Sequence, residues 1–417
     1  MIDFALSEEI ENYRQLIHAL AENTMRPISR EYDEREHEKP REWLRMMWDV
    51  SQGSSVTFGG SSEKKDGKKD RAVDAKRDGH SERFLNSAVS IEELSWGDAG
   101  LYLSIPNPGL GGAAVAAAGT PEQRRRFLER FKGGEPKWGA MAITEPGCGS
   151  DSAAITTTAV RDGDQWVLNG TKIFCTSGLM AAQESEGFVV VWATVDKSAG
   201  RAGIKAFVVD HHTPGMTVTK VEDKLGIRAS DTASIVFEDC RIPLDNILGS
   251  PEVKGATDGF KGVMATFDAT RPIVAASAIG IGRAAVDFVR EVLQREGVTI
   301  HYDAAPHKLT AVERDFMEME SNLQAARLLT WRAAWMMDQG MHNNLEASMA
   351  KAKAGLAVTQ VTQKAVELLG PLGYSRKLLL EKWMRDAKIN DIFEGTQQIN
   401  VMIVARRILG YSSKELN

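Results

Sequence analysis

The chain has 417 residues, more than one hydrophobic core usually organises, so its length predicts two or three domains. Its composition, with 43% hydrophobic and 26% charged residues, is typical of a soluble globular enzyme, and no run of about 18 apolar residues predicts membrane insertion. The formal net charge of -6 argues against nucleic acid as the main partner, because phosphate binding needs a basic surface.

Residues 1–137 are predicted to form an N-terminal helical domain. Apolar residues recur at helical spacing from Ser7 to about Arg30, and Ser7 is placed to cap that helix. Residues 51–88 break the pattern with Gly/Ser clusters and a run of charges, which predicts a mobile surface loop, with a docking segment as the alternative. A later helix is expected to begin at the cap residue Thr120. The helical patterns that resume after the loop cover residues 89–103, 110–118 and 120–131.

Residues 138–251 are predicted to form an antiparallel β domain. β-Branched residues alternate there, and the dipeptides Asp162-Gly163 and Asn169-Gly170 are typical of turns. Strands that follow one another without intervening helices disfavour a parallel doubly wound sheet, and with it a nicotinamide-binding Rossmann domain.

Residues 252–417 are predicted to form a C-terminal four-helix bundle, because long helices joined by short loops pack in that way. Gly370 and Gly410 stand where helices should stop. The fold class is therefore α+β but mostly α, in the order helical, β, helical. The four helical segments of the bundle are about 258–296, 309–340, 345–369 and 397–409.

The cysteines bear on the compartment and on metal content. Cys148, Cys175 and Cys240 show neither metal-ligand spacing nor the density of a secreted disulfide framework. The N-terminus lacks an apolar signal core and an Arg/Ser-rich transit pattern. We therefore expect no metal and a cytoplasmic location.

Small residues mark the first of three stretches that could carry chemistry, MAITEPGCGSDSAA at 141–154. Gly147 and Gly149 can adopt backbone angles closed to other residues, so successive N–H groups can point at an anion or a heteroaromatic edge. A tight loop without a ligand is the alternative.

A glutamate marks the second stretch, INDIFEGTQQINVMIVARRILG at 389–410, where Glu394 and Gly395 precede a helix that Thr396 can cap. In an apolar pocket the pKa of the Glu394 carboxyl would rise towards neutrality, which suits a general base. A solvated loop acid is the alternative for Glu394 taken alone.

An arginine marks the third stretch, ATFDATRPIVAASAIGIG at 265–282, which places Asp268 and Arg271 on one helical turn. The guanidinium fork of Arg271 suits phosphate and other polar groups. A surface pair between Asp268 and Arg271 is the alternative. The small residues that follow allow close helix packing.

In these stretches the sequence resembles the acyl-CoA dehydrogenase family. The resemblance covers most of the chain outside residues 51–88, and it implies FAD as cofactor and an acyl-CoA thioester as substrate. The implied reaction is α,β-dehydrogenation to the trans-2-enoyl-CoA. Four segments fall in family order with near-family spacing: TEPGCGSD at 144–151, LGIRASDTASIVFEDCRIP at 225–243, FDATRP at 267–272 and MRDAKINDIFEGTQQI at 384–399.

Glu394 resembles the catalytic base of the medium-chain type, which removes the pro-R α-hydrogen while a hydride leaves the β-carbon for flavin N5. The alternative base of the isovaleryl type is a glutamate just before the arginine of the 267–272 motif, where this chain has Thr270. The resemblance also implies that the thioester carbonyl accepts hydrogen bonds from the backbone N–H of Glu394 and from a flavin ribityl hydroxyl.

The remaining site residues follow from the same resemblance. Arg295 belongs to a motif through which an adjacent subunit reaches FAD, although the Phe-Gly that follows it in the family is missing here, and Glu367 stands where the family has glutamine. Residues expected to contact the substrate are Ser150, Asp268, Arg271 and Gly395. Residues expected to contact FAD are Met141, Ile143, Thr144, Gly149, Ser150, Phe174, Cys175, Thr176, Arg295, Glu367, Gly370, Thr396, Gln397 and Gln398.

Partners and substrate length are implied less directly. The resemblance implies a homotetramer and an electron-transferring flavoprotein as electron acceptor, and the weakened Arg295 motif leaves a heterotetramer open. An oxidase relative, a non-catalytic FAD-binding scaffold and a DNA-binding relative of this fold are further alternatives. The small residues Gly112, Ala113 and Ala114, in the helix that closes the acyl pocket in the family, predict a long or bulky acyl chain.

Overall fold

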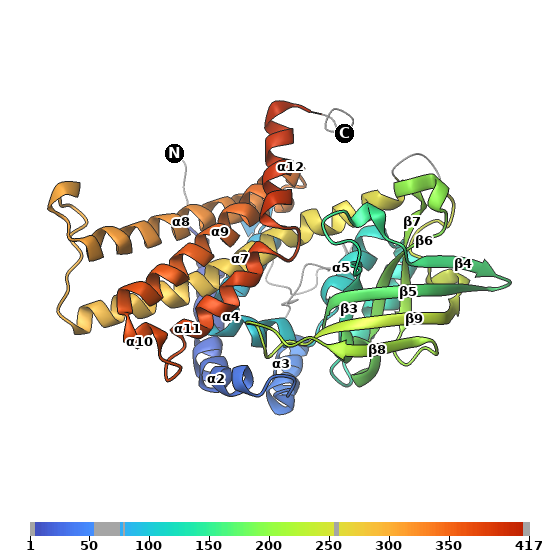
Figure 1. The fold of residues 1–417 in the computed structure, drawn as a ribbon, viewed down its shortest axis with the longest axis horizontal. Helices are drawn as coiled ribbons and strands as arrows, with labels where there is room; N and C mark the ends of the chain where they lie inside the picture. The colour runs from blue at the N-terminus through green and yellow to red at the C-terminus, as the bar shows by residue number, and fades with distance from the viewer. Residues whose placement is uncertain (1–4, 54–75, 78–79, 254–257, 412–417) are drawn as a thin grey trace.

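The computed structural model describes residues 5–53, 76–77, 80–253 and 258–411 of the chain. The N-terminal and C-terminal helices form one helical body, and a β domain stands beside it (Figure 1). This arrangement confirms the predicted fold class. The β domain occupies the middle of the chain but one side of the molecule, so helices of the first and last domains pack directly on each other.

The N-terminal helices begin where the sequence places caps. The hydroxyl of Ser7 accepts a hydrogen bond from the backbone N–H of Ile10, and Thr120 and Gln123 form a reciprocal capping box, which confirms both predicted caps. A π-helical turn, Ala21–Met25, joins the first two helices. The helices are α1 Glu8–Leu20, α2 Arg26–Glu34, α3 Arg41–Gly53, α4 Arg83–Ser104, α5 Gly109–Ala118 and α6 Pro121–Leu128.

The stretch predicted as a loop, residues 51–88, is helical at both ends, because α3 extends to Gly53 and α4 begins at Arg83. The carboxylate of Asp338, the last residue of helix α8 (Ala311–Asp338), accepts hydrogen bonds from two backbone N–H groups in the first turn of α4, at 2.9 and 3.0 Å. This cap comes from a residue far along the chain, so the local pattern could not reveal it. Two short paired strands, β1 Lys76–Arg77 and β2 His80–Ser81, lie between, and the rest of the stretch is outside the described residues.

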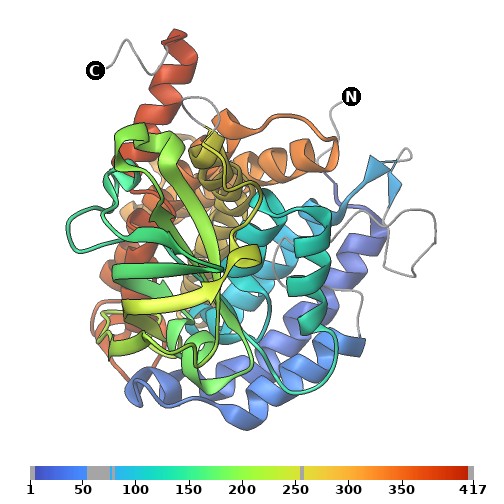
Figure 2. The same ribbon diagram turned by 90° about the vertical axis from the view of Figure 1, so that its right-hand side faces the viewer.

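The strands of the β domain form, within the described residues, one seven-stranded sheet with the spatial order β3-β6-β4-β5-β9-β8 and with β7 paired to β6. Four pairs are antiparallel as predicted, but β3 and β4 each pair with β6 in parallel. Figure 2 shows this sheet in front of the helical body. The strands are β3 Gly139–Ala142, β4 Thr158–Asp162, β5 Gln165–Thr176, β6 Phe188–Thr194, β7 Ile204–Asp210, β8 Met216–Val221 and β9 Thr232–Pro243.

One of the two predicted turns is wrong. Asp162-Gly163 does turn the chain between β4 and β5, with a φ of 60° at Gly163. Asn169-Gly170 instead lies inside β5, at a β-bulge opposite β9. A Cβ atom on Gly170 would lie 2.4 Å from the Thr157 hydroxyl oxygen, so the glycine serves a close approach of backbones rather than a turn.

The C-terminal helices also stop and start at the predicted residues. Gly370 and Gly410 follow their helices with φ of 51° and 74°, and the Thr396 hydroxyl accepts from the N–H of Ile399. A 3-10 turn, η8 Lys388–Asp391, precedes the last helix, which projects from the body (Figure 1). The helices are α7 Asp258–Arg295, α8 Ala311–Asp338, α9 Asn344–Leu369, α10 Pro371–Tyr374, α11 Leu380–Ala387 and α12 Gln397–Leu409.

The central helix of the body is α7, which packs on α4, α8 and α9. A Cβ atom on Gly280 would lie 2.2 Å from the carbonyl oxygen of Glu92, so the small residues of α7 do allow the close packing that the sequence predicts. From Gly262 to Arg295 this helix is long and apolar enough to cross a membrane by length and composition, although it is interrupted by charged residues. Its most apolar window is 72% buried inside the protein, as in a core helix.

Candidate active site

Glu394 lies in a short turn between η8 and α12. Two successive residues of this turn have positive φ, 55° at Glu394 and 90° at Gly395. A non-glycine residue rarely adopts such a conformation, and it persists where the surroundings hold it, often at functional sites. The carbonyl oxygen of Gly395 accepts hydrogen bonds from Lys351 Nζ at 2.7 Å and from Asn400 Nδ2 at 2.8 Å. The turn is therefore held on both sides by helices α9 and α12.

The carboxylate of Glu394 accepts a hydrogen bond from the hydroxyl of Thr270 on α7, at 2.8 Å. Burial raises the pKa of Glu394 above its ordinary value, while the Thr270 hydrogen bond and the positive charges of Arg271 and Lys351 act in the opposite direction. Half-buried and held by Thr270, Glu394 is not a freely solvated loop acid. Thr270, which stands where the sequence resemblance implies an alternative base, is thus in direct contact with Glu394.

A cavity of about 1240 Å³ lies beside Glu394, between the β domain and the helical body. Its other walls come from the C-terminal end of α4, from α5, from the connection between β8 and β9, and from α7 and α12. Its lining includes residues from the stretches 141–154 and 389–410 and some from the stretch 265–282. The expected site residues that line it are Met141, Ile143, Thr144, Gly149, Ser150, Phe174, Thr176, Arg271, Glu394, Gly395 and Thr396.

The loop that follows β3 is held to the sheet by Glu145, whose residue is only 4% exposed. Its carboxylate accepts hydrogen bonds from the N–H and hydroxyl groups of Thr156 and Thr157 and from Lys172 Nζ, at 2.6 to 2.9 Å. Burial opposes ionisation of Glu145, but these donors outweigh it and lower its pKa to about 2. The loop that presents Thr144 and Ser150 to the cavity is therefore held in place by these contacts of Glu145.

The third stretch is only partly in the cavity. Arg271 lines it and is 2% exposed, while Asp268, which does not line it, accepts a hydrogen bond from Arg271 Nη1 at 2.9 Å and another from Asn344 Nδ2 at 2.8 Å. The pair is therefore not the surface pair that was the alternative. Burial lowers the pKa of Arg271, and its Nε has no hydrogen-bond partner among the described residues.

Several expected FAD contacts lie elsewhere. The side chain of Cys175 points into the core and donates its thiol hydrogen to the carbonyl oxygen of Met141, because alternate residues of a strand face opposite sides. Gln398 is exposed, and Arg295 and Glu367 are exposed towards the ends of α7 and α9. The residues expected to contact FAD that do not line the cavity of this chain are Cys175, Arg295, Glu367, Gly370, Gln397 and Gln398.

Two residues at the site were not assigned a role from the sequence. Thr270 was noticed only as a missing glutamate, although its place beside Arg271 in the motif was a usable signal. Lys351 lies in the segment EASMAKAKAG, which has the pattern of an ordinary helix face. The sequence indicates its role only weakly: Lys351 lies one helical turn from Ala347 and one from Gly355, and both of these positions are buried.

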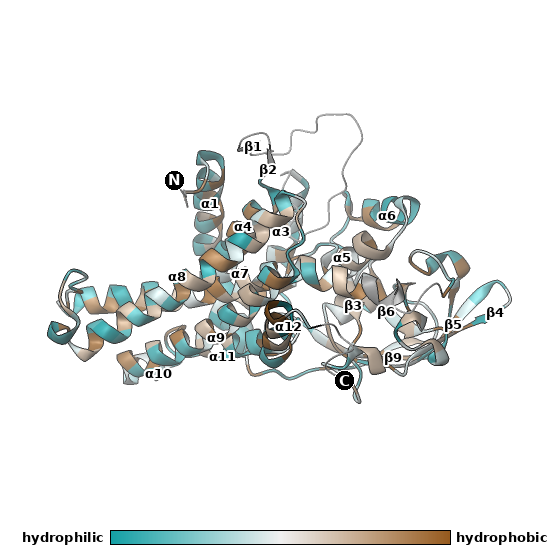
Figure 3. Cartoon of the chain, turned by 90° about the horizontal axis from the view of Figure 1, so that it is seen from above, coloured by the Kyte–Doolittle hydropathy of each residue, from teal (hydrophilic) through white to brown (hydrophobic). Residues whose placement is uncertain are grey.

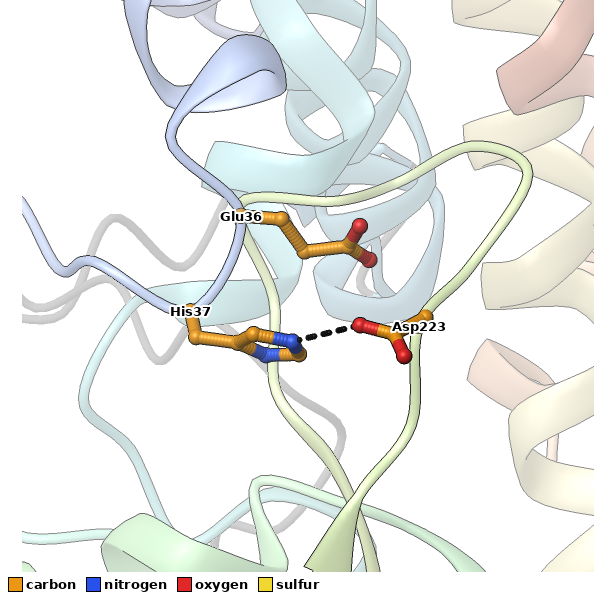
Figure 4. Close-up of side chains that lie close together, drawn as sticks. All are labelled: Glu36, His37 and Asp223. Carbon is orange, nitrogen blue, oxygen red and sulfur yellow. Dashed lines mark hydrogen bonds and ion pairs between the residues drawn. The ribbon is translucent and has the colours of Figure 1, made fainter.

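A separate cluster, formed by Glu36, His37 and Asp223, lies at the connection between β8 and β9 (Figure 4). One ligand atom from each residue lies within 4.8 Å of the others. His37 Nε2 is 2.9 Å from Asp223 Oδ1, and Glu36 pairs with Arg228 at 2.8 Å. These contacts tie the N-terminal helices to the rim of the cavity and account for the cluster without an ion.

Comparison with known proteins gives the class that this fold and cavity define. Three models of the acyl-CoA dehydrogenase family match: the N-terminal domain at residues 72–135, the middle domain at 140–240 and the C-terminal domain at 257–409. The mitochondrial short-chain specific acyl-CoA dehydrogenase of Bos taurus is 41% identical over 328 residues, which are 78% of this chain and 76% of that protein.

Solved structures agree with the sequence comparison. Butyryl-CoA dehydrogenase from Megasphaera elsdenii has a TM-score of 0.81 at 31% identity, covering 98% of this chain and 100% of that one. A chain from the structure of the electron transferring flavoprotein of Acidaminococcus fermentans has a TM-score of 0.82 at 32% identity, covering 98% and 100%. The chain belongs to the acyl-CoA dehydrogenase family. It is an enzyme that dehydrogenates acyl-CoA.

Members of this family bind FAD, and the residues of this chain fit that cofactor. Thr144 and Thr176 line the cavity, and neither hydroxyl has a hydrogen-bond partner in the described part of the chain. The side-chain oxygen Oε1 of Gln397 is buried, again without a partner among the described residues. Such unpartnered polar groups suit the carbonyl, ring N–H and hydroxyl groups of a flavin.

Proposed function

We propose that Glu394 is the catalytic base of an acyl-CoA dehydrogenase that acts on short, straight acyl chains. The observation that carries the assignment is the position of its carboxylate, which lines the cavity on a held turn and has a raised pKa. The backbone N–H of Glu394 has no partner among the described residues, so it remains available to the thioester carbonyl.

In the proposed reaction the α-C–H bond of the acyl group breaks and its proton moves to the carboxylate of Glu394. The electron pair forms the double bond between the α- and β-carbons, and the hydride leaves the β-carbon. Bound FAD supplies the acceptor for that hydride. Thr270 holds one oxygen of Glu394, and Met141, Ile143, Thr144, Gly149, Ser150, Phe174 and Thr176 form the wall that would hold the isoalloxazine ring.

A short acyl chain replaces the long or bulky one expected from the sequence. Cβ atoms on Gly109 and Gly111 would lie 2.6 Å from the carbonyl oxygens of Gly139 and Ala140, so these two glycines serve the close packing of α5 on β3 and do not by themselves indicate room for a long chain. Of the three small residues that suggested the long chain, only Ala113 lines the cavity, next to the bulkier Leu110. The short-chain and butyryl-CoA specificities in the names of the relatives support the same choice.

The substrate proposal predicts an order of rates. Mixed anaerobically with the FAD-loaded protein, butyryl-CoA is expected to bleach the flavin at least about 10-fold faster than octanoyl-CoA, because each misfit methylene in a closed pocket costs about 1–3 kcal/mol. Stopped-flow absorbance with butyryl-, hexanoyl-, octanoyl-, palmitoyl- and isovaleryl-CoA measures this order. Faster bleaching by palmitoyl-CoA than by butyryl-CoA would contradict the short-chain proposal.

Replacement of Thr270 by valine is expected to shift the pH dependence of the reaction. Valine keeps the shape but removes the hydrogen bond that favours the ionised carboxylate, so the pKa of Glu394 should rise further. The acid limb of kcat/KM against pH should then move to higher pH by about 1 to 2 units, because a hydrogen bond to a charged group is worth about 1.5–3 kcal/mol. On the plateau kcat should change much less, since Glu394 is ionised there in both proteins. An unmoved acid limb would show that another group titrates.

We also propose a homotetramer in the cytoplasm with an electron-transferring flavoprotein as acceptor. The exposed apolar residues of the projecting helix α12 support assembly, since Val401, Met402, Ile408 and Leu409 are 49% to 64% exposed and the helix is coloured as hydrophobic in Figure 3. Arg295 and Glu367, outside this chain's cavity, would then reach FAD in an adjacent subunit. The similar chain from the Acidaminococcus fermentans structure supports the acceptor, and three buried, unpaired cysteines support a reducing compartment.

A further inference from the structure

Three lysines are buried to 1% exposure or less among the described residues, and one of them differs from the other two. Lys172 pairs with Glu145 at 2.8 Å, and Lys382 pairs with Asp98 and Asp386 at 2.7 and 2.6 Å. Lys351 has no such carboxylate within ion-pair distance in the described part of the chain. A buried ammonium without a counter-charge costs stability, so its presence calls for a role.

The contact that Lys351 makes is with the base turn. Its Nζ donates to the carbonyl oxygen of Gly395, the residue after Glu394, at 2.7 Å. Two further residues of α9 on the same face, at i+4 and i+8, touch the segment before the base: a Cβ atom on Gly355 would lie 2.6 Å from the Asn390 carbonyl oxygen, and Thr359 donates to Asp391 at 3.0 Å. One face of α9 therefore supports the chain from residue 390 to residue 395.

We propose that Lys351 is a positioning residue for the reaction, and that its ammonium group holds the Gly395 carbonyl so that the Glu394 carboxylate and backbone N–H keep their places in the cavity. The proposal rests on Glu394 being the base. Three observations carry it: burial of Lys351, its single contact with the turn, and the positive φ at both residues of that turn. Asn400 holds the same carbonyl oxygen from α12 but carries no charge.

The charge of Lys351 has a second consequence. The charged groups that act on it are Glu394 and Asp391 from the base segment and Arg271 from α7. Burial lowers the pKa of Lys351 to about 8, against the attraction of the two carboxylates. The unfolded lysine titrates near 10.5, so between pH 8 and 10.5 the unfolded state holds more protons and the free energy of unfolding should rise with pH. Lys351 therefore serves the site at neutral pH at the expense of stability.

The test compares Lys351→Met and Lys351→Arg with a matched control, Lys353→Met. Lys353 lies on the same helix, but its Nζ donates to Asn322 on α8. Lys351→Met should lower kcat by about 10- to 100-fold through a misplaced base, with KM for butyryl-CoA and FAD content little changed. Its acid limb should move to higher pH, because a positive charge that favours ionised Glu394 is gone. Its melting temperature should stay the same or rise, because methionine is uncharged.

Lys351→Arg should keep the acid limb of the wild type and restore part of kcat, since a guanidinium stays charged, and Lys353→Met should leave every reading unchanged. Wild-type kcat and pH dependence in Lys351→Met would overturn the proposal. Equal losses in Lys351→Met and Lys353→Met, with lowered melting temperatures, would also overturn it, because they would show only a weakened α9. If instead the wild type and Glu394→Gln bleach equally fast, the proposed base itself fails.

Discussion

Glu394→Gln is expected to slow anaerobic flavin reduction by butyryl-CoA by about 100- to 10,000-fold, the usual contribution of a positioned general base. The amide has nearly the same shape as the carboxylate, but it cannot accept the α-proton. Its carbonyl oxygen can still accept the Thr270 hydrogen bond, so the turn should keep its conformation. FAD absorbance and substrate binding should therefore remain close to those of the wild type while the rate falls.

The control for this prediction is Glu42→Gln, an equal change of charge on the exposed face of α3. It should leave the rate unchanged, which separates the loss of a base from a change in net charge. Rapid mixing with absorbance detection gives the rate directly. If Glu394→Gln reduced its flavin as fast as the wild type, Glu394 would have no role as the base. Loss of FAD from Glu394→Gln alone would assign the residue to cofactor binding instead.

Glu145→Ala is expected to destabilise the protein by about 3–5 kcal/mol, because it leaves the ammonium of Lys172 buried without a counter-charge. It also removes the acceptor for two backbone N–H groups at the end of the loop that lines the cavity. The same loop carries Thr144 and Ser150, so FAD content should fall together with stability. Urea-induced unfolding followed by tryptophan fluorescence, together with flavin absorbance after gel filtration, measures both effects.

The double variant Glu145→Ala/Lys172→Met provides the matched control, because it removes both charges and leaves an apolar side chain in place of the lysine. It should recover part of the lost stability. The pKa of Glu145, lowered to about 2 in the folded protein, predicts in addition that the stabilisation is present above pH 4.5 and is lost as the pH falls from there towards 2. Equal stability of the wild type and Glu145→Ala at pH 7 would disprove the ion pair's role.

Local chemistry was enough to predict the elements and much of the cavity wall. The caps at Ser7, Thr120 and Thr396 need only a hydroxyl beside the first turn, and helix ends at Gly370 and Gly410 need only a residue that tolerates positive φ. Glu394 and Thr144 could be named as candidates because the motifs around them resemble those of the acyl-CoA dehydrogenase family. Each of these features depends on neighbours a few residues away.

The failures have a common cause in contacts between distant segments. Asn169-Gly170 has the composition of a turn, but the approach of Thr157 uses the glycine inside a strand. The N–H groups that begin α4 are capped by Asp338, which belongs to α8. The small residues Gly112, Ala113 and Ala114 predict room for a long acyl chain, but Gly109 and Gly111 of the same helix are small because they pack against the carbonyl groups of β3. No local pattern contains such information.

The sequence by itself therefore determined the order of domains, several helix caps and ends and, through its resemblance to the acyl-CoA dehydrogenase family, the base candidate, because these depend on periodicity, caps and motifs within one segment. Only the tertiary structure decided which hydrogen-bond donors and charges act on Glu394 and its turn. Thr270 and Lys351 reach its turn from two different helices, and whether a lysine is paired, exposed or buried against a carbonyl depends on how those helices pack.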